Sequence, residues 1–136
     1  MKRTTANQYL SQYILLRDAM PSNGSYEWVS CCTCGMMMSR FGSNSHAGHF
    51  IGKGLGGGSG VYYDERNVHA QCHRCNEYEQ GNGAEYYPFM LEKYGQEVID
   101  ELRMKHRLRR PHSIDKYGIM YREMYKELKK KYGLKK

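Results

Sequence analysis

Two pairs of cysteines constrain the fold of this chain more than any other feature of its sequence. Cys31 and Cys34 form one C-x2-C motif, and Cys72 and Cys75 form a second. A tight turn at each motif aims two sulfurs at one point, so the motifs together predict a closed tetrahedral site for structural Zn²⁺. Gly35 follows the first pair, where such a turn favours a residue that tolerates a positive φ.

Two disulfides are the rival interpretation of these four cysteines. Polar residues interrupt the apolar positions of the N-terminal stretch, which makes it a poor signal peptide and predicts a cytosolic protein. A cytosol keeps thiols reduced, which favours zinc over disulfides. Cys32 is left over, either as a bystander or as a substitute for Cys31 in a C-x-C variant. No apolar run approaches the roughly 20 residues that span a bilayer, so we expect no membrane segment.

The net charge of +7 is concentrated in one part of the chain. Of the 21 lysines and arginines, fourteen lie at or beyond Glu92, and this segment holds the whole excess of positive charge. A local surplus of cations favours a polyanionic partner, and nucleic acid is the first expectation. The alternative is a solvated helical surface with a basic tail.

The length of 136 residues suggests a single domain, 1–136, with a zinc-supported core over about 26–91 and a basic helical extension over about 92–136. Helical spacing of apolar residues predicts helices over 4–20, from about Pro88 to Arg107, and over 113–131. Strands are expected at Y-E-W-V-S-C, A-G-H-F-I-G and V-Y-Y-D, and a helix over 68–81. The order strand, glycine-rich loop, strand, helix is a ββα unit, so the expected fold class is α+β with flanking N-terminal and C-terminal helices.

Three polar residues of the ββα unit can supply what phosphodiester hydrolysis needs. His49 lies on its first strand, His46 precedes it by three residues, and Asn76 directly follows the last cysteine. Histidine titrates in the range suited to a base that deprotonates water. Oxygen ligands suit a catalytic Mg²⁺ or Mn²⁺, and imidazole also suits Mn²⁺ or softer ions.

The motifs resemble those of a known family. C-C-T-C-G, H-A-G-H-F, D-E-R-N-V-H-A-Q-C-H-R-C-N and a trailing G-N, over about residues 28–95, are similar to the phage NinG (Rap) recombination nucleases of the HNH, or ββα-metal, class. The Cys-Cys-Asn ending also resembles the phage Holliday-junction resolvase endonuclease VII. The resemblance implies a metal-dependent DNA endonuclease that acts on branched recombination intermediates, such as Holliday junctions and D-loops, in the cytoplasm of the host. It also implies a homodimer, because two strands of a junction must be cut.

Carried over by position, the resemblance assigns roles to individual residues. His49 would be the general base, Asn76 a ligand of the catalytic cation, and Asn67 the residue that holds the hairpin presenting His49. The structural zinc would be held by Cys31, Cys34, Cys72 and Cys75.

The chain departs from the family pattern at one point. Many HNH sites place an aspartate directly before the base histidine, where this chain has Gly48, and the endonuclease VII pattern has its aspartate at the position of His46. An imidazole in place of a carboxylate favours Mn²⁺ or another transition ion, with His46 as a ligand. Asp64 or Glu65 is the alternative source of a carboxylate.

Several basic residues are expected to contact DNA phosphates. They are Lys53, Arg74, Arg109 and Arg110. His69 and His73 would share one face of the predicted helix, as phosphate or metal contacts or as surface residues. Removing residues 108–136 is expected to weaken DNA binding.

Two other functions compete with the nuclease. One is a zinc-stabilised DNA-binding protein without catalysis, which zinc and basic helices predict equally well. The other is an interaction protein that uses its methionine and tyrosine stripes, against which the basic surplus argues. His49 together with Asn76 separates the nuclease from the DNA-binding protein, because a protein that only binds has no need to position them.

Overall fold

The computed structural model describes residues 1–21, 25–52, 60–108 and 113–134 of the chain. Its helices are α1 (Arg3–Asp18), α2 (Gly83–Tyr94), α3 (Gln96–Leu108) and α4 (Ile114–Lys131), with a 3-10 turn η1 (Glu65–Asn67) and a π-helical turn η2 (Arg74–Tyr78). Its strands are β1 (Trp28–Ser30), β2 (Met37–Ser39), β3 (Ser45–His49) and β4 (Val68–Cys72). They form two antiparallel pairs, β1–β2 and β3–β4. The expected α+β class is therefore confirmed.

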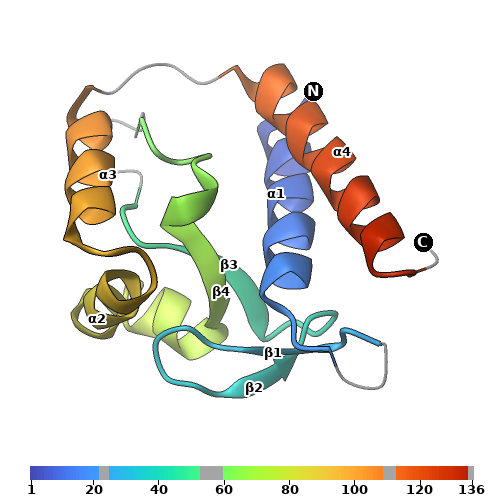
Figure 1. Ribbon diagram of the computed structural model, residues 1–136, viewed down its shortest axis with the longest axis horizontal. Coiled ribbons are helices and arrows are strands. Elements are labelled where there is room, and N and C mark those ends of the chain that lie inside the picture. The colour runs from blue at the N-terminus through green and yellow to red at the C-terminus, as the bar shows by residue number, and fades with distance from the viewer. Residues whose placement is uncertain (22–24, 53–59, 109–112, 135–136) are drawn as a thin grey trace.

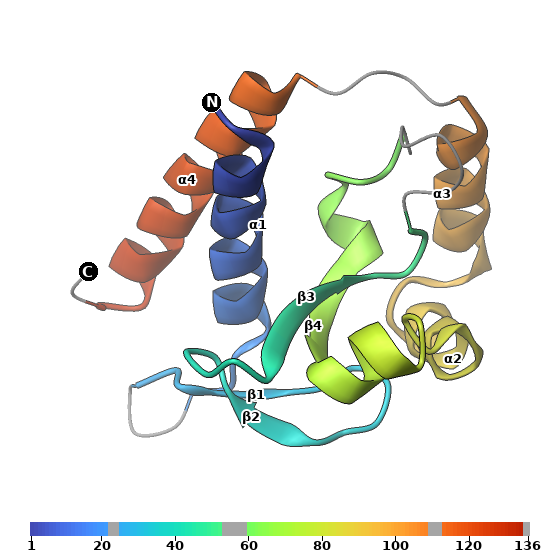
Figure 2. The same cartoon turned by 180° about the vertical axis from the view of Figure 1, so that it is seen from behind.

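The β3–β4 pair lies between two pairs of helices. Helices α1 and α4 run side by side on one side of it, and α2 and α3 lie on the other (Figure 1). The opposite view shows the same order, with the β1–β2 hairpin across one end (Figure 2). Val68 of β4 packs with Leu10 of α1 and Tyr121 of α4, while Tyr86 and Ile99 anchor the cluster around α2 and α3. None of the described helices is long and apolar enough to cross a lipid bilayer.

The first and last predicted helices agree with α1 and α4, but the single helix predicted between them is wrong. This segment forms two helices, because Gly95 adopts φ 91° between them and ends the first. The first of the two also begins earlier than predicted, at Gly83 rather than near Pro88, and Pro88 lies inside it.

The second strand of the β3–β4 pair is also not where the sequence placed it. Residues 61–63 form a turn, and the strand is Val68–Cys72, which we predicted as the start of a helix. All five residues of β4 are buried, including the polar His69 and Gln71, so the strand lacks the alternation of apolar and polar residues that marks a half-exposed strand. The predicted order of two strands followed by a helical segment is still present, but the helical segment is only the short η2.

Candidate functional site

Four cysteines gather where the two hairpins meet. Cys31 and Cys34 lie in the turn between β1 and β2, Cys72 ends β4, and Cys75 lies in η2. Their sulfurs all lie within 4.8 Å of one another, and those of Cys34 and Cys72 are 3.7 Å apart. A zinc ion about 2.3 Å from each sulfur requires tetrahedral sulfur–sulfur distances of about 3.8 Å, whereas a disulfide requires about 2.05 Å. All five cysteines are free, so the cluster fits a metal ion such as zinc.

Backbone hydrogen bonds shape the first half of the cysteine cluster. The N–H of Gly35 donates to the carbonyl of Cys31 at 2.9 Å, and Gly35 adopts φ 80°, as the sequence predicted. The N–H of Cys32 donates to the carbonyl of Ala70 in β4 at 2.9 Å, which ties this turn to the second hairpin. The Cys32 side chain is not among the four clustered sulfurs and packs instead with the residues around Tyr86.

The thiols of the cluster differ in acidity. Burial disfavours the Cys31 thiolate, but hydrogen bonds from the Thr33 hydroxyl and neighbouring backbone N–H groups outweigh burial and lower the pKa of Cys31 to about 6. Burial raises the pKa of Cys72 to about 12. One thiolate therefore forms readily, whereas further thiolates beside it require a compensating cation.

A pocket of about 270 Å³ lies between α1 and β3, close to the cysteine cluster. It brings together the three residues that the sequence singled out for chemistry, His46, His49 and Asn76. Its other walls are Asn7, Leu10 and Ser11 of α1, Ser45 and Ala47 of β3, and Tyr62.

His49 is oriented by the connection between β3 and β4. Its Nε2 lies 2.9 Å from the carbonyl oxygen of Tyr62, and its ring stacks on the Tyr62 ring with 4.1 Å between centroids. A carbonyl only accepts hydrogen bonds, so in neutral His49 the proton is on Nε2 and the lone pair is on Nδ1.

Asn67 holds the two ends of this connection together. Its buried side chain accepts from the N–H of Ile51 at 2.9 Å and donates to the carbonyls of Ile51 and Val61 at 2.9 and 3.2 Å. Val61 directly precedes Tyr62, whose carbonyl orients His49. Asn67 is therefore placed where it supports the position of His49.

His46 lies in a second cluster of possible metal ligands, separate from the cysteines. His46, His73 and Glu77 have ligand atoms that all lie within 4.8 Å of one another. Nε2 of His46 is 3.3 Å from Nδ1 of His73, and Nδ1 of His46 is 3.1 Å from the amide nitrogen of Asn76. The Glu77 carboxylate is 3.8 Å from the same Nδ1.

The sequence did not single out Glu77. Residues three and four apart share one face of a helical turn, so His73, Asn76 and Glu77 lie together once the turn begins after Cys72. The carboxylates considered instead are engaged elsewhere and do not line the pocket. Asp64 pairs with Arg66 at 2.9 Å, and Glu65 accepts from the Tyr13 hydroxyl at 3.0 Å.

The structure leaves little room for a side chain at Gly48, the residue before His49. A Cβ atom added to Gly48 would overlap the side-chain amide of Gln71, which is fully buried across the strand pair. Gln71 in turn donates to the carbonyl of Gly81 at 2.7 Å and to the Thr33 hydroxyl at 3.2 Å. An aspartate at position 48 would therefore require Gln71 to move.

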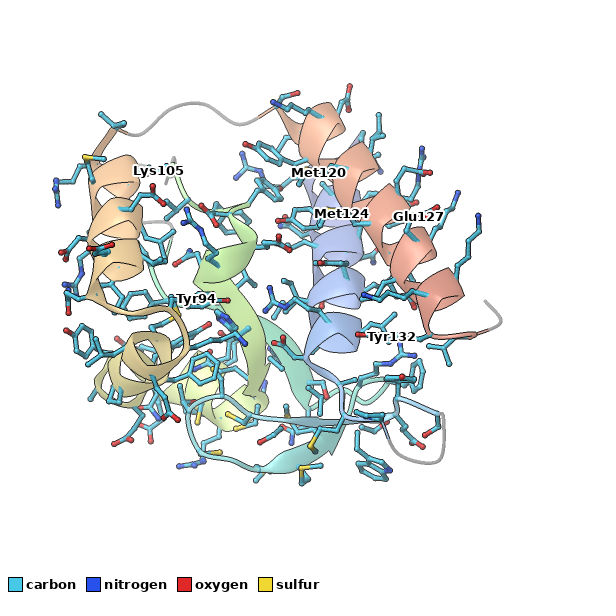
Figure 3. The ribbon with its side chains drawn as sticks, in the orientation of Figure 1. Tyr94, Lys105, Met120, Met124, Glu127 and Tyr132 are labelled. Carbon is cyan, nitrogen blue, oxygen red and sulfur yellow. The ribbon has the colours of Figure 1, made fainter. Side chains whose placement is uncertain are left out.

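His69 does not share a helix face with His73. It lies in β4, where its Nδ1 is 3.0 Å from the Tyr86 hydroxyl and its Nε2 is 2.8 Å from the Tyr94 hydroxyl. Figure 3 shows Tyr94 reaching from α2 towards β4. Burial, followed by the charges of Arg17 and Lys93, lowers the pKa of His69 to about 2. His69 is therefore a neutral buried residue, and the predicted phosphate, metal or surface role is wrong.

The predicted DNA contacts are only partly described. Arg74 is exposed and pairs with Glu79 at 3.6 Å, whereas Lys53, Arg109 and Arg110 lie outside the described residues. Helix α4 adds exposed cations at Lys126, Lys130 and Lys131. The same helix packs Met120 and Met124 towards α1 (Figure 3), so removing it would also remove part of the core.

The comparisons with known proteins agree on one family. The family model described as "Bacteriophage Lambda NinG protein" matches residues 3–133. Protein ninG of Escherichia phage 933W is 32% identical over 78 residues, which are 57% of this chain and 36% of that protein. Protein ninG of Salmonella phage P22 is 31% identical over 82 residues, 60% of this chain and 38% of that protein.

Protein ninG of Escherichia phage lambda is 31% identical over 78 residues, 57% of this chain and 36% of that protein. The chain therefore spans little more than a third of the length of the curated relatives it matches. No solved structure matches the chain.

Proposed function

The chain belongs to the bacteriophage lambda NinG family, and on that premise we propose that it is a metal-dependent DNA endonuclease of the HNH, or ββα-metal, class. The observation that carries the proposal is the pocket in which His46, His49 and Asn76 meet, beside a cysteine cluster that fits zinc. The order strand, strand, helical turn, with a base histidine on the first strand, supports the same class.

In this proposal His49 is the general base. Its Nδ1 takes the proton of the water that attacks the phosphorus, and the proton remains on the imidazolium until solvent removes it. The Tyr62 carbonyl and ring hold the imidazole, so little reorientation is needed before proton transfer. The Tyr62 carbonyl also stabilises the imidazolium, because it accepts the Nε2 proton in both charge states.

The residues that would hold a catalytic cation are His46, His73 and Glu77, with Asn76 beside them. Two imidazoles and a carboxylate form a donor set that suits Mn²⁺ or another transition ion better than Mg²⁺. A divalent cation held by these residues would supply polarisation of the phosphate and stabilisation of the leaving oxygen. Asn76, whose amide lies 3.1 Å from Nδ1 of His46, would offer its amide oxygen as a further ligand.

Branched recombination intermediates in the host cytoplasm are the substrates we propose, with a homodimer cutting two strands. The alternative is a zinc-stabilised DNA-binding protein without catalysis, supported by the exposed cations of α4. The two are separated by incubating the purified protein with Holliday-junction and linear DNA in Mn²⁺, Mg²⁺ or neither. Cleavage that requires a divalent cation and is lost in His49→Ala supports the nuclease, whereas binding without cleavage supports the alternative.

A further inference from the structure

A second pocket continues the histidine pocket along α1. The two share Ser11 of α1 and Ser45 of β3. The second pocket extends away from His49 to Gln8 and Gln12 of α1, Arg40 and Phe41 after β2, and Tyr125 of α4. We call the two pockets together the α1 groove.

The far end of the α1 groove carries aromatic rings next to cations. Phe41 is 69% exposed, and the Arg40 guanidinium lies 4.1 Å from its ring centroid. Arg40 is itself fixed, because its Nε donates to the carbonyl of Tyr26 at 2.8 Å. Tyr125 of α4 also lines this end, and the Lys129 ammonium lies 4.6 Å from its ring centroid.

The chemistry of the α1 groove suits a nucleic acid strand. Among the described residues, no aspartate or glutamate lines either of its pockets, although the Glu77 carboxylate lies 3.8 Å from Nδ1 of His46 at the near end. Gln8 and Gln12 offer both donors and acceptors, which match the polar edges of bases. Exposed aromatic rings beside cations are the usual platform for unpaired bases, because a base stacks on the ring while the cation meets the phosphate.

We propose that the α1 groove binds unpaired DNA nucleotides next to the cleaved phosphate, with a base stacked on Phe41 and the backbone passing Arg40 and Lys129. The inference rests on the proposed nuclease function and deepens it, because it makes the substrate a DNA with single-stranded nucleotides at the cleavage point. Bases inside a continuous duplex are already stacked on their neighbours, so their faces cannot reach Phe41.

The test is the binding of a fluorescent oligo-dT strand and of a duplex of equal length, measured by anisotropy without added divalent cation. Phe41→Ala is expected to weaken single-strand binding about tenfold, within the range for one stacked base. Phe41→Tyr keeps a ring and is expected to bind as the wild type does. Met104→Ala, which removes an exposed apolar side chain on α3, is the matched control and should leave binding unchanged.

Three results would overturn the inference. They are no single-strand binding by the wild type, equal single-strand affinity of the wild type and Phe41→Ala, and a loss of duplex affinity in Phe41→Ala as large as its loss of single-strand affinity. Tighter binding of an RNA strand than of the DNA strand would overturn the assignment to DNA. Cleavage is assayed in parallel on a junction. If binding depends on Phe41 but the wild type does not cleave the junction, the nuclease function is rejected and the groove assignment stands. If Phe41→Ala changes neither binding nor cleavage, only the groove assignment is rejected.

Discussion

The side-chain amide of Asn76 lies 3.1 Å from Nδ1 of His46, although the two residues are thirty positions apart. Asn76 directly follows Cys75, whose sulfur is buried in the cysteine cluster. The turn that delivers Cys75 to the cluster therefore also delivers Asn76 to the histidine pocket. Changes to the cysteines are expected to reach the pocket through this turn.

His49→Ala is expected to lower the rate of DNA cleavage by roughly 10² or more, the usual contribution of a general base. Zinc content should be unchanged, because His49 is not one of the four cysteine-cluster residues, and the variant is expected to retain DNA binding. Single-turnover cleavage of a junction in Mn²⁺ measures the effect. His106→Ala on α3 is the control, and equal rates for the two variants would remove His49 from the mechanism.

Glu77→Gln is expected to weaken Mn²⁺ binding by about tenfold, because it removes the carboxylate from the cluster with His46 and His73. Isothermal titration of the zinc-loaded protein with Mn²⁺ measures the affinity. Glu79→Gln changes an exposed carboxylate of the same segment and serves as the control. An affinity equal to that of the wild type in Glu77→Gln would place the cation elsewhere.

Cys72→Ser is expected to abolish stoichiometric zinc binding and to lower the thermal unfolding temperature, because structural zinc contributes folding free energy on the order of 10 kcal/mol. Elemental analysis and calorimetry measure the two effects. Cys32→Ser changes a neighbouring cysteine outside the cluster and should keep its zinc. If Cys72→Ser retains zinc and Cys32→Ser loses it, Cys32 rather than Cys72 is the zinc ligand.

His69 makes stability depend on pH. Below about pH 6.5 the unfolded chain binds a proton at His69, whereas the folded protein, in which the pKa of His69 is about 2, does not. The free energy of unfolding should therefore fall as the pH drops below about 6.5, by about 1.4 kcal/mol per pH unit from this residue. Urea titrations of the wild type and His69→Gln between pH 7 and 5 give the difference in slope. Identical slopes would show that His69 is protonated in the folded state.

The cations at the end of α4 are expected to contribute to DNA affinity and to its salt dependence. Replacing Lys129, Lys130 and Lys131 by glutamine should reduce the slope of log K against log salt by about 0.9 for each DNA phosphate that the variant no longer neutralises. Replacing them by arginine keeps the charge and should leave the slope near that of the wild type. An unchanged slope in the glutamine variant would place the DNA-binding surface elsewhere. This design avoids truncation, which would remove Tyr121 from the core.

The cysteine cluster could be located from the sequence because a C-x2-C spacing has few structural solutions, and two such motifs in one chain converge on one ion. His46, His49 and Asn76 could be located through the resemblance and their neighbourhood to the cysteines, and the structure brings them to one pocket. Their catalytic roles stay predictions.

The error at β4 arose because tertiary contacts bury polar residues in the interior. His69 and Gln71 have the pattern of an exposed helix, yet hydrogen bonds to Tyr94 and Gly81 bury them in a strand. Glu77 went unnoticed because its contact with His46 exists only once the strand ends at Cys72 and the turn begins.

On the proposed function, the short link between Cys75 and Asn76 implies an order of maturation. Zinc held by the cysteines would anchor the turn that keeps Asn76 beside His46. Competence to cut would then begin with metal loading rather than with translation.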